Sequence, residues 1–381
     1  METVKGFSDY TGEEALKRAA IRKIIEETFQ QYGFEPAETP IIEQEEFVRG
    51  ENSDDEAVSD IFKLQDKGKR KLALRYEFTF QLKRIAKNKK LPYKRYQIGS
   101  VFRDEPVSAN RVRQITQCDV DVVGAGIKEE AEVLAVAQRI FKNLGLKVDI
   151  NFNNRKLLNE ILDNEGIKKK GDVIREIDKL DKLSEKDVRE NLKKYGAEKI
   201  LGIIKKPKIF FKKYSDFLEV VELEKACKNY GVKINFCPSL ARGLSYYNGS
   251  VFEIKTSGVS ETISAGGSFL VGGFQATGIS FGLDRLSKIA KVEPVRIKVM
   301  VISIKQDKEA VKLAESLRDS GVSCVVSLAK ISKAMEIANS RGIEKVVFVG
   351  AEEVKKKKFK VKDMGSGKES FVGLKEISKV L

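Results

Sequence analysis

The sequence predicts an α+β fold with a core of strands and helices, a helical insertion and a smaller C-terminal α/β region. The first observation is a set of strand-like segments in the first third of the chain. The second is their return at Val232–Phe236, after a stretch of short helical patterns rich in Lys and Glu. The third is a regular alternation of strand and helix patterns after Ile297. At 381 residues the chain is long enough for two or three domains.

The first elements are a long helix and several strands. A capping-box pattern at Thr11 and Glu14 opens an apolar helical stripe that stops at Gly33. The segment Glu38–Glu43 follows as a strand that contains Pro40. Because proline has no N–H to donate, we expect this strand at a sheet edge or at an interface. Further strands are expected at Leu72–Leu74, Tyr96–Phe102 and Gln117–Val123, the last with alternating apolar and polar side chains.

The remaining elements divide the chain. We predict a core at residues 1–152 and 231–290, a helical insertion at 153–230, a linker at 291–295 and an α/β domain at 296–381. The last region contains alternating strands and helices at Ile297–Ile302, Lys308–Asp319, Ser323–Ser327, Ile331–Arg341 and Val346–Gly350. Its short basic block, Lys355–Lys358, is expected in a solvated loop.

The composition restricts the chemistry. The chain has no histidine, which excludes an imidazole base, a His-containing triad and a His metal site. Four cysteines are scattered without close pairs, at Cys118, Cys227, Cys237 and Cys324. This spacing excludes a zinc-type cysteine framework and fits a reducing cytoplasm. Catalysis would therefore depend on Arg, Lys, carboxylates, backbone amides and Mg²⁺, as in phosphate chemistry.

Charge and hydropathy restrict the possible functions less than the absence of histidine does. The net charge of +15, from 71 Lys and Arg against 56 Asp and Glu, suits a polyanionic partner, but the lysines are spread along the chain. The longest apolar runs, such as Val346–Val349, are strand-sized, and the N-terminus lacks an apolar signal core. We therefore expect no membrane association and a cytoplasmic location.

The most informative segment is Leu240–Glu253, which reads Leu-Ala-Arg-Gly-Leu-Ser-Tyr-Tyr-Asn-Gly-Ser-Val-Phe-Glu. Arg242 precedes a glycine, and Tyr246 and Tyr247 lead into a β-prone run. A fixed cation and two phenol groups at a sheet edge suit a small zwitterion and a phosphate. The ordinary alternative is a turn followed by a strand.

A second group of polar residues lies between Tyr96 and Asp121. Arg103 and Glu105 are two positions apart, so a regular strand places them on one face. One could bind a phosphate oxygen, and the other could accept a hydrogen bond from an adenine amino group. A surface ion pair is the alternative for these two residues alone. The same segment also carries Arg111, Arg113, Gln117 and Asp119.

Two further segments complete the pattern. Gly278-Ile-Ser-Phe-Gly-Leu-Asp-Arg-Leu286 is a glycine-containing strand that leads into a helix carrying Arg285. The other segment is Ala73-Leu-Arg-Tyr-Glu-Phe-Thr79. Together, and in the order in which they follow along the chain, the four segments closely resemble those of histidyl-tRNA synthetases. These enzymes activate histidine with ATP and attach it to tRNA. Leu240–Glu253 resembles their signature peptide, and the resemblance extends over nearly the whole chain.

The resemblance implies a class II synthetase core with a mixed, mainly antiparallel sheet, a helical insertion and a C-terminal anticodon-binding domain. It implies a homodimer with Pro40 at the interface, and histidine, histidine tRNA, ATP and Mg²⁺ as partners, without a protein metal site. Arg103 and Arg242 would be catalytic and clamp the α-phosphate. The ATP-binding residues would be Arg103, Glu105, Arg111, Arg113, Ile115 and Arg285. The histidine-binding residues would be Glu77, Thr79, Gln117, Asp121, Arg242, Tyr246 and Tyr247.

The chain also departs from the family pattern. Ser245 replaces an aspartate, Ile115 replaces an adenine-stacking phenylalanine, and Ser268-Phe269-Leu270 replaces Arg-Tyr-Asp. Because the arginines of the site are retained, we favour an active enzyme. A regulatory paralogue of histidine biosynthesis and an RNA-binding subunit without chemistry are the alternatives. Such regulatory relatives lack the anticodon-binding domain, and the alternation after Ile297 argues against them.

Overall fold

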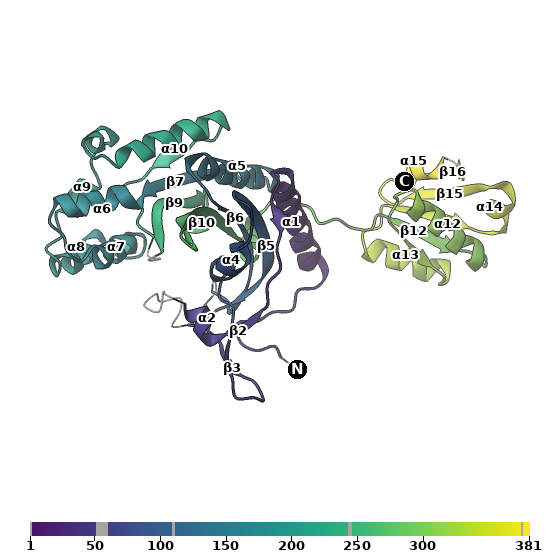
Figure 1. Cartoon of the computed structure of the whole chain (residues 1–381). Helices are drawn as coiled ribbons and strands as arrows, with labels where there is room; N and C mark the ends of the chain where they lie inside the picture. The colour runs from purple at the N-terminus through teal and green to yellow at the C-terminus, as the bar shows by residue number, and fades with distance from the viewer. Residues whose placement is uncertain (1, 51–59, 109–110, 243–245, 375) are drawn as a thin grey trace. The chain divides into compact units, whose positions relative to one another are not determined.

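The computed structural model describes residues 2–50, 60–108, 111–242, 246–374 and 376–381 (Figure 1). The chain forms two compact units, Met1–Pro294 and Val295–Leu381. The larger unit combines an extended sheet with helices, and the smaller unit has a sheet of its own. The predicted α+β fold class is confirmed.

An eight-stranded sheet forms the centre of the larger unit, in the order β1-β5-β6-β11-β10-β9-β7-β8. All pairs from β5 to β7 are antiparallel, whereas β1 and β8 pair in parallel at the two edges. The sheet is therefore mixed and mainly antiparallel, as predicted. Its strands are β1 (Glu35–Pro36), β5 (Tyr93–Phe102), β6 (Gln114–Val123), β7 (Val148–Asn154), β8 (Asn235–Phe236), β9 (Tyr247–Thr256), β10 (Val259–Val271) and β11 (Phe274–Gly282).

One face of this sheet is the hydrophobic core. Two long helices, α1 (Gly12–Gln31) and α5 (Ile127–Asn143), lie against it (Figure 1). The ring of Phe281 on β11 lies 6.1 Å from Phe29 of α1 and 5.6 Å from Phe141 of α5, measured between centroids. All three rings are fully enclosed. The short helix α11 (Leu283–Ile289) follows β11 and also contributes to this core.

The N-terminal elements differ from two predictions. Thr11 precedes α1, but its side chain makes no capping hydrogen bond. Pro40 lies before strand β2 (Ile42–Gln44) and not within it, so the expected strand is shorter because it begins only after the proline. Strand β2 belongs to a small antiparallel sheet in the order β2-β4-β3, completed by β3 (Lys63–Gln65) and β4 (Lys71–Leu74). Helices α2 (Glu45–Arg49) and α4 (Thr79–Ala86) flank it.

Strands expected from the sequence form at β4, β5 and β6. Residues 117–123 of β6 are all buried, so the alternation of apolar and polar side chains does not separate core from solvent. The second face of the main sheet is therefore enclosed as well. It carries polar side chains such as Asp119 and Asp121 beside an apolar cluster that includes Tyr93, Val123 and Phe269.

Between β7 and β8 the chain is helical, as the sequence indicates. Asn154 caps the first of these helices by accepting hydrogen bonds from the backbone N–H groups of Lys156 and Leu157. The last of them, α10, packs against α5 of the core. The helices are α6 (Arg155–Asn164), α7 (Lys170–Asp178), α8 (Glu185–Lys193), α9 (Ile200–Ile203) and α10 (Phe217–Asn229), with short 3₁₀ turns η1 (Lys179–Asp181) and η2 (Lys208–Lys213).

The smaller unit has a five-stranded sheet in the order β13-β12-β14-β15-β16. Strands β12, β13 and β14 are parallel, and β15 and β16 add to β14 in antiparallel fashion. The alternation of strands and helices after Ile297 is confirmed, and the final hairpin was not foreseen. The elements are β12 (Val299–Ser303), α12 (Asp307–Asp319), β13 (Cys324–Ser327), α13 (Ile331–Ser340), β14 (Lys345–Val349), α14 (Ala351–Lys356), β15 (Lys358–Asp363), β16 (Glu369–Gly373) and α15 (Ile377–Val380).

The basic block Lys355–Lys358 is not a loop, which corrects the prediction. Lys355 and Lys356 end α14, and Lys358 begins β15. Lys357 between them has a left-handed backbone with φ of 49°, which ends the helix. The lysine-rich composition hid these two element ends.

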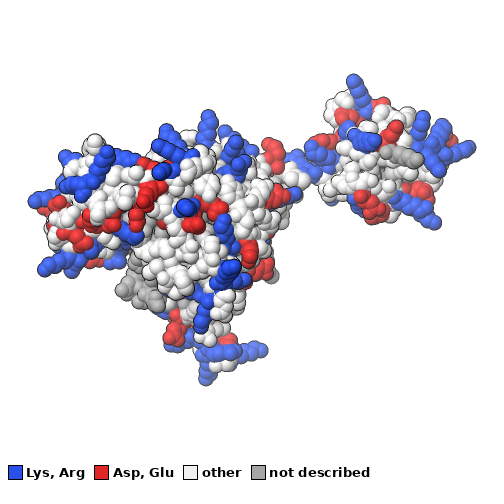
Figure 2. Space-filling view, turned by 45° about the horizontal axis from the view of Figure 1, so that its top comes forward, with Lys and Arg blue, Asp and Glu red and all other residues white. Residues whose placement is uncertain are grey.

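Charged side chains are spread over both units. Figure 2 shows Lys and Arg interspersed with Asp and Glu on the visible face, without a single large patch of one sign. Within the described parts of the chain, none of the helices is long and apolar enough to cross a membrane.

Candidate active site

The second face of the main sheet carries polar side chains in a row that the strand register defines. Arg95 on β5 is opposite Asp121 on β6, and Asp121 is opposite Gly278 on β11. Gly278 is in turn opposite Gly267 on β10. These residues alternate along each strand with core residues, so they share the face that α1 and α5 do not cover.

The paired glycines bring two predicted histidine-binding side chains close together. A Cβ atom at Gly278 would lie 2.0 Å from Oδ1 of Asp121, and one at Gly267 would lie 2.8 Å from the ring of Tyr247. The carboxylate and the phenol ring therefore lie directly over neighbouring glycines. Directly opposed residues of antiparallel strands are about 5 Å apart. Larger residues at the two glycine positions would displace both side chains.

Tyr247 is buried, Tyr246 beside it is half-buried, and both phenols are uncharged. The ring centroids of Tyr246 and Tyr247 are 4.7 Å apart, and Phe269 packs edge-on to Tyr246 at 5.8 Å. Burial raises the pKa of both tyrosines, and the Glu77 carboxylate raises it further. Arg242 opposes the rise at Tyr247. Both hydroxyls therefore remain protonated at neutral pH and can donate hydrogen bonds.

Gln117 lies on the same face in a small polar network. Its amide nitrogen donates to Ser280 Oγ at 2.7 Å and to Asp119 Oδ1 at 3.2 Å, and the Ser280 hydroxyl donates to Asp119 at 2.5 Å. Burial raises the pKa of Asp119, and Arg95 opposes this rise. Among the described atoms, Oε1 of Gln117 is buried without a hydrogen-bond partner. This oxygen can accept a hydrogen bond from an ammonium group.

The predicted ATP-binding residues are at the ends of β5 and β6. Arg103 follows β5 and donates from Nε to the carbonyl oxygen of Tyr76 at 3.3 Å. Glu105 pairs with Arg111 at 3.2 Å, and Arg113 pairs with Asp104 at 3.0 Å. Arg111 and Arg113 already have acidic partners, so a bound phosphate would compete with these carboxylates. Ile115 is opposite Val101 on β5 and half-buried.

Arg242 is held in an unusual backbone conformation. Its φ of 44° is rare for a residue with a side chain. Arg155 at the start of α6 donates to the carbonyl oxygens of Ala241 at 3.0 Å and of Arg242 at 3.4 Å. Nη1 of Arg242 lies 3.8 Å from Glu253, and its Nε is buried without a partner among the described atoms. Local strain held by the surrounding structure is common at functional sites.

Arg285 and Arg242 are linked through Glu253. Arg285 donates to the backbone carbonyl of Thr262, and the Thr262 hydroxyl donates to Glu253. Lys255 lies 3.2 Å from the same carboxylate. The sequence interpretation did not assign a role to Glu253, although it is the last residue of the signature peptide. Its neighbours could be found only from the pairing of β9 with β10.

The positions at which the chain departs from the family pattern have different surroundings in the structure. Ser268 is buried and donates to Glu130 of α5 at 2.5 Å. Burial raises the pKa of Glu130, and its Oε2 has no partner among the described atoms. Leu270 is exposed, and Ser245 lies outside the described residues. The loss of the family arginine at Ser268 thus leaves Glu130 with a small hydroxyl partner.

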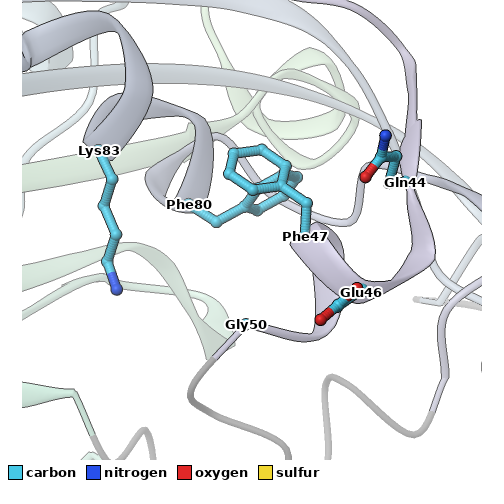
Figure 3. Close-up of a pocket in the computed structure, with 6 residues that line it drawn as sticks. All are labelled: Gln44, Glu46, Phe47, Gly50, Phe80 and Lys83. Atoms are coloured by element: carbon cyan, nitrogen blue, oxygen red, sulfur yellow. The ribbon is translucent and has the colours of Figure 1, made fainter.

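The remaining predicted residues frame the site. Glu77 and Thr79 precede and begin α4. A separate cavity of about 450 Å³ lies along the same helix (Figure 3). It is lined by Gln44, Glu46, Phe47, Gly50, Phe80 and Lys83, and none of these is a predicted ligand-binding residue. In the described part of the chain, no three His, Cys, Asp or Glu side chains cluster as a metal site.

Comparisons with known proteins assign the family. Residues 6–286 match the family model described as histidyl-tRNA synthetase, and residues 297–381 match the anticodon binding domain. The chain is 33% identical to histidine–tRNA ligase 1 of Bacillus cereus, over 100% of this chain and 99% of the relative. It is 36% identical to histidine–tRNA ligase 2 of Shouchella clausii, over 97% of this chain and 98% of the relative.

Solved structures agree with this assignment. The crystal structure of histidyl-tRNA synthetase from Nostoc sp. PCC 7120 superposes with a TM-score of 0.87 at 27% identity, covering 100% of this chain and 99% of that one. A structure from Bacillus halodurans, described as an ATP phosphoribosyltransferase regulatory subunit/histidyl-tRNA synthetase, shares the fold with a TM-score of 0.78 at 20% identity, covering 91% of this chain and 97% of that one. The chain belongs to the histidyl-tRNA synthetase family, a class II aminoacyl-tRNA synthetase family.

Proposed function

We propose that the protein is a histidine–tRNA ligase that activates histidine with ATP and transfers it to the 3′ end of histidine tRNA. The observation that supports this most is the position of Asp121 and Tyr247 over the paired glycines Gly278 and Gly267. A carboxylate acceptor and a phenol donor on neighbouring positions match the two nitrogens of an imidazole ring. A site of this kind can reject analogues that lack either nitrogen by large factors.

The α-amino group of histidine would lie at the other side of the pocket. Gln117 offers an enclosed carbonyl oxygen, and Glu77 lies close enough to the tyrosine pair to raise their pKa. Both groups are acceptors, which an ammonium donor requires. Thr79, at the start of α4, and Tyr246 would complete the contacts with histidine.

Activation would be attack of the histidine carboxylate on the α-phosphate of ATP, with release of pyrophosphate. The carboxylate is already ionised at neutral pH, so alignment and charge neutralisation matter more than a general base. We assign the α-phosphate to Arg103 and Arg242 and the γ-phosphate to Arg285. Glu105, Arg111, Arg113 and Ile115 would bind the remainder of ATP.

Mg²⁺ would enter mainly with ATP. In phosphate-transfer sites it is usually held by phosphate oxygens, water and one or two carboxylates, and not by a cluster of protein ligands. Glu253, the carboxylate nearest Arg242, already faces Lys255 and accepts from Thr262. This carboxylate is therefore a poor candidate for a metal ligand, and we assign no protein ligand to the ion.

The C-terminal unit would bind the tRNA anticodon. Support comes from the match of residues 297–381 to the anticodon binding domain and from the separate core of that unit. We retain the proposed division into a catalytic core at 1–152 and 231–290, an insertion at 153–230, a linker at 291–295 and the domain at 296–381. We also propose that the enzyme is a cytoplasmic homodimer.

This division is tested by a chain that ends at Val292. Because the proposed amino-acid and ATP sites lie in the larger unit, the shortened protein should keep histidine-dependent exchange of pyrophosphate into ATP. Without phosphate contacts from the smaller unit it should charge tRNA poorly. Gel filtration would establish that it folds and keeps the oligomeric state of the full chain. Aminoacylation at the full-length rate would contradict the anticodon role.

The alternative is a paralogue without catalysis, as a regulatory subunit of histidine biosynthesis or an RNA-binding subunit. The buried Glu130, which has Ser268 as its partner, is the observation that favours this alternative. The test is pyrophosphate exchange by the full chain with each of the 20 amino acids, followed by charging of histidine tRNA. The ligase should show exchange with histidine alone and should then charge the tRNA. A folded protein that binds histidine without exchange would instead be the paralogue.

A further inference from the structure

Arg95 is a fully enclosed arginine on the polar face of the main sheet, and none of the roles above uses it. It is 0% exposed and the largest of the fully buried side chains. It belongs to β5, where its side chain shares a face with Gln97. Its position opposite Asp121 in the strand register places a fixed cation at the edge of the proposed histidine site.

Arg95 connects the two halves of that site. Its Nη2 lies 2.8 Å from Oδ2 of Asp121 and donates to the carbonyl oxygen of Phe78 at 3.2 Å. Phe78 stands between Glu77 and Thr79, which we assign to the α-amino end of histidine. One nitrogen therefore bridges the carboxylate at the imidazole end and the backbone at the amino end.

A contribution to fold stability does not explain why Arg95 and Asp121 form a buried ion pair. Nε and Nη1 of Arg95 are buried without a hydrogen-bond partner among the described atoms. A buried ion pair with unsatisfied donors contributes little to stability, and replacement of such pairs by apolar residues is often neutral or stabilising. The contribution of Arg95 is therefore to be sought in its effect on Asp121.

We propose that Arg95 is a positioning residue that keeps Asp121 ionised and oriented, so that Asp121 accepts a hydrogen bond from the imidazole N–H of histidine. This inference rests on the proposed function. An ionised carboxylate only accepts hydrogen bonds, whereas a protonated one would present its own donor to the ring. The same arginine, through Phe78, fixes the distance between the acceptors for the two ends of the substrate.

The surroundings of Asp121 support this role. The charged and titratable groups that face it are Arg95 from β5, Asp119 from β6 and Tyr247 from β9. Strands β10 and β11 bring only Gly267 and Gly278 to its position. Burial raises the pKa of Asp121 to about 7, Arg95 opposes the rise, and Asp119 adds to it. Arg95 is thus the cation that keeps the carboxylate ionised near neutral pH.

The test uses the full-length chain and compares Arg95→Met with Arg95→Lys. Turnover and KM for histidine are measured by pyrophosphate exchange from pH 6 to pH 9. Loss of the cation should raise the pKa of Asp121 by a unit or more, which corresponds to about a tenfold change in ionisation. Because about half of Asp121 is ionised at pH 7, and about a tenth would be after a rise of one unit, Arg95→Met should raise the KM for histidine at least about fivefold at pH 7, with a smaller effect on kcat. The acidic limb of kcat/KM should move upward by about one pH unit, and Arg95→Lys should restore part of it.

Arg75→Met is the matched control. Arg75 is also almost fully buried, but it donates to the carbonyl oxygens of Ser100 and Thr39 and does not contact Asp121. Its loss should lower the melting temperature without moving the acidic limb. Histidine itself titrates in the same way in every assay. A difference between variants in the pH of the acidic limb is therefore caused by a group of the protein.

A double-mutant cycle gives an independent readout. In an Asp121→Asn background, Arg95→Met should add little to the KM for histidine, because the group on which Arg95 acts is gone. Additive effects, or a KM raised equally at every pH, would overturn the positioning role. If Arg95→Met does not fold, the role of Arg95 is tested by the shift of the acidic limb of kcat/KM in Arg95→Lys. Exchange by the unsubstituted chain is measured first: its absence defeats the proposed function, whereas its presence with unshifted variants defeats only the role of Arg95.

Discussion

The two faces of the main sheet are made by the same strands but differ in the side chains that they bury. On the face covered by α1 and α5, residues such as Phe281 pack in apolar contact with Phe29 and Phe141. On the other face, Arg95 and Asp121 are equally enclosed but polar, and several of their atoms lack partners among the described residues. Burial of such groups costs free energy unless they are satisfied. The difference indicates that one face stabilises the fold and the other retains hydrogen-bonding capacity for a ligand.

The largest expected effect tests the apolar face. Phe281→Ala should lower the free energy of unfolding by about 3–5 kcal/mol, because it removes a ring enclosed between two others. Chemical denaturation would measure the change. The fraction that remains folded should keep a nearly normal KM for histidine. A large change in KM with unchanged stability would contradict the division between the faces.

Arg242 tests the chemistry on the polar face. Arg242→Ala should slow histidyl adenylate formation by at least about 100-fold, which is typical for loss of one preorganised charge contact. Pyrophosphate exchange at saturating histidine and ATP gives the rate. The exposed Lys298, in the smaller unit, provides a control as Lys298→Ala with near-normal exchange. If Arg242→Ala exchanged as fast as the unsubstituted chain, the arginine would have no part in the mechanism.

The glycine pair tests how the two ends of the imidazole site are held. A Cβ atom at Gly278 would lie 2.0 Å from Oδ1 of Asp121, so Gly278→Ala must displace that carboxylate. We expect the KM for histidine to rise about tenfold, the cost of roughly one hydrogen bond. Gly171→Ala, in α7 with nothing near its Cβ position and without a positive φ, is the comparison for the general effect of an added methyl group. Equal KM values for the two variants would show that Asp121 is not displaced from a histidine contact.

A further effect is the pH dependence of stability. The pKa of Asp121, about 7, is above its ordinary value of 3.8, because burial disfavours the charge. Between about pH 4 and pH 7 the folded chain holds a proton that the unfolded chain has lost. The stabilisation that Asp121 provides is therefore complete below pH 4 and is lost as the pH rises through 7.

Asp121→Asn removes this dependence. The difference in unfolding free energy, unsubstituted chain minus variant, should fall as the pH rises from 4 to 8. Each pKa unit corresponds to about 1.4 kcal/mol. Urea titrations across this range measure the difference. If this free-energy difference increased with pH instead, ionised Asp121 would stabilise the fold. The main role of Arg95 would then be that of a structural ion-pair partner.

Sequence reasoning was strongest where the signal is local. The apolar stripe of α1 and the strand patterns of β5 and β6 predicted their elements, because burial selects side chains with a fixed period. The polar residues Asp121 and Tyr247 could be proposed from their motifs. Their mutual placement could not, because it depends on which strands are neighbours. Arg95 was missed for the same reason, since only the pairing of β5 with β6 shows that its partner is Asp121.

The most direct test of the account is a crystal structure of the protein with bound histidine. The imidazole ring should lie over the paired glycines Gly267 and Gly278, with one nitrogen donating to Asp121 and the other in contact with the Tyr247 hydroxyl. Its α-amino group should face Gln117 and Glu77, and Arg95 should still bridge Asp121 and Phe78. Histidine bound with its amino group at Asp121, or bound away from this face, would contradict the central claim.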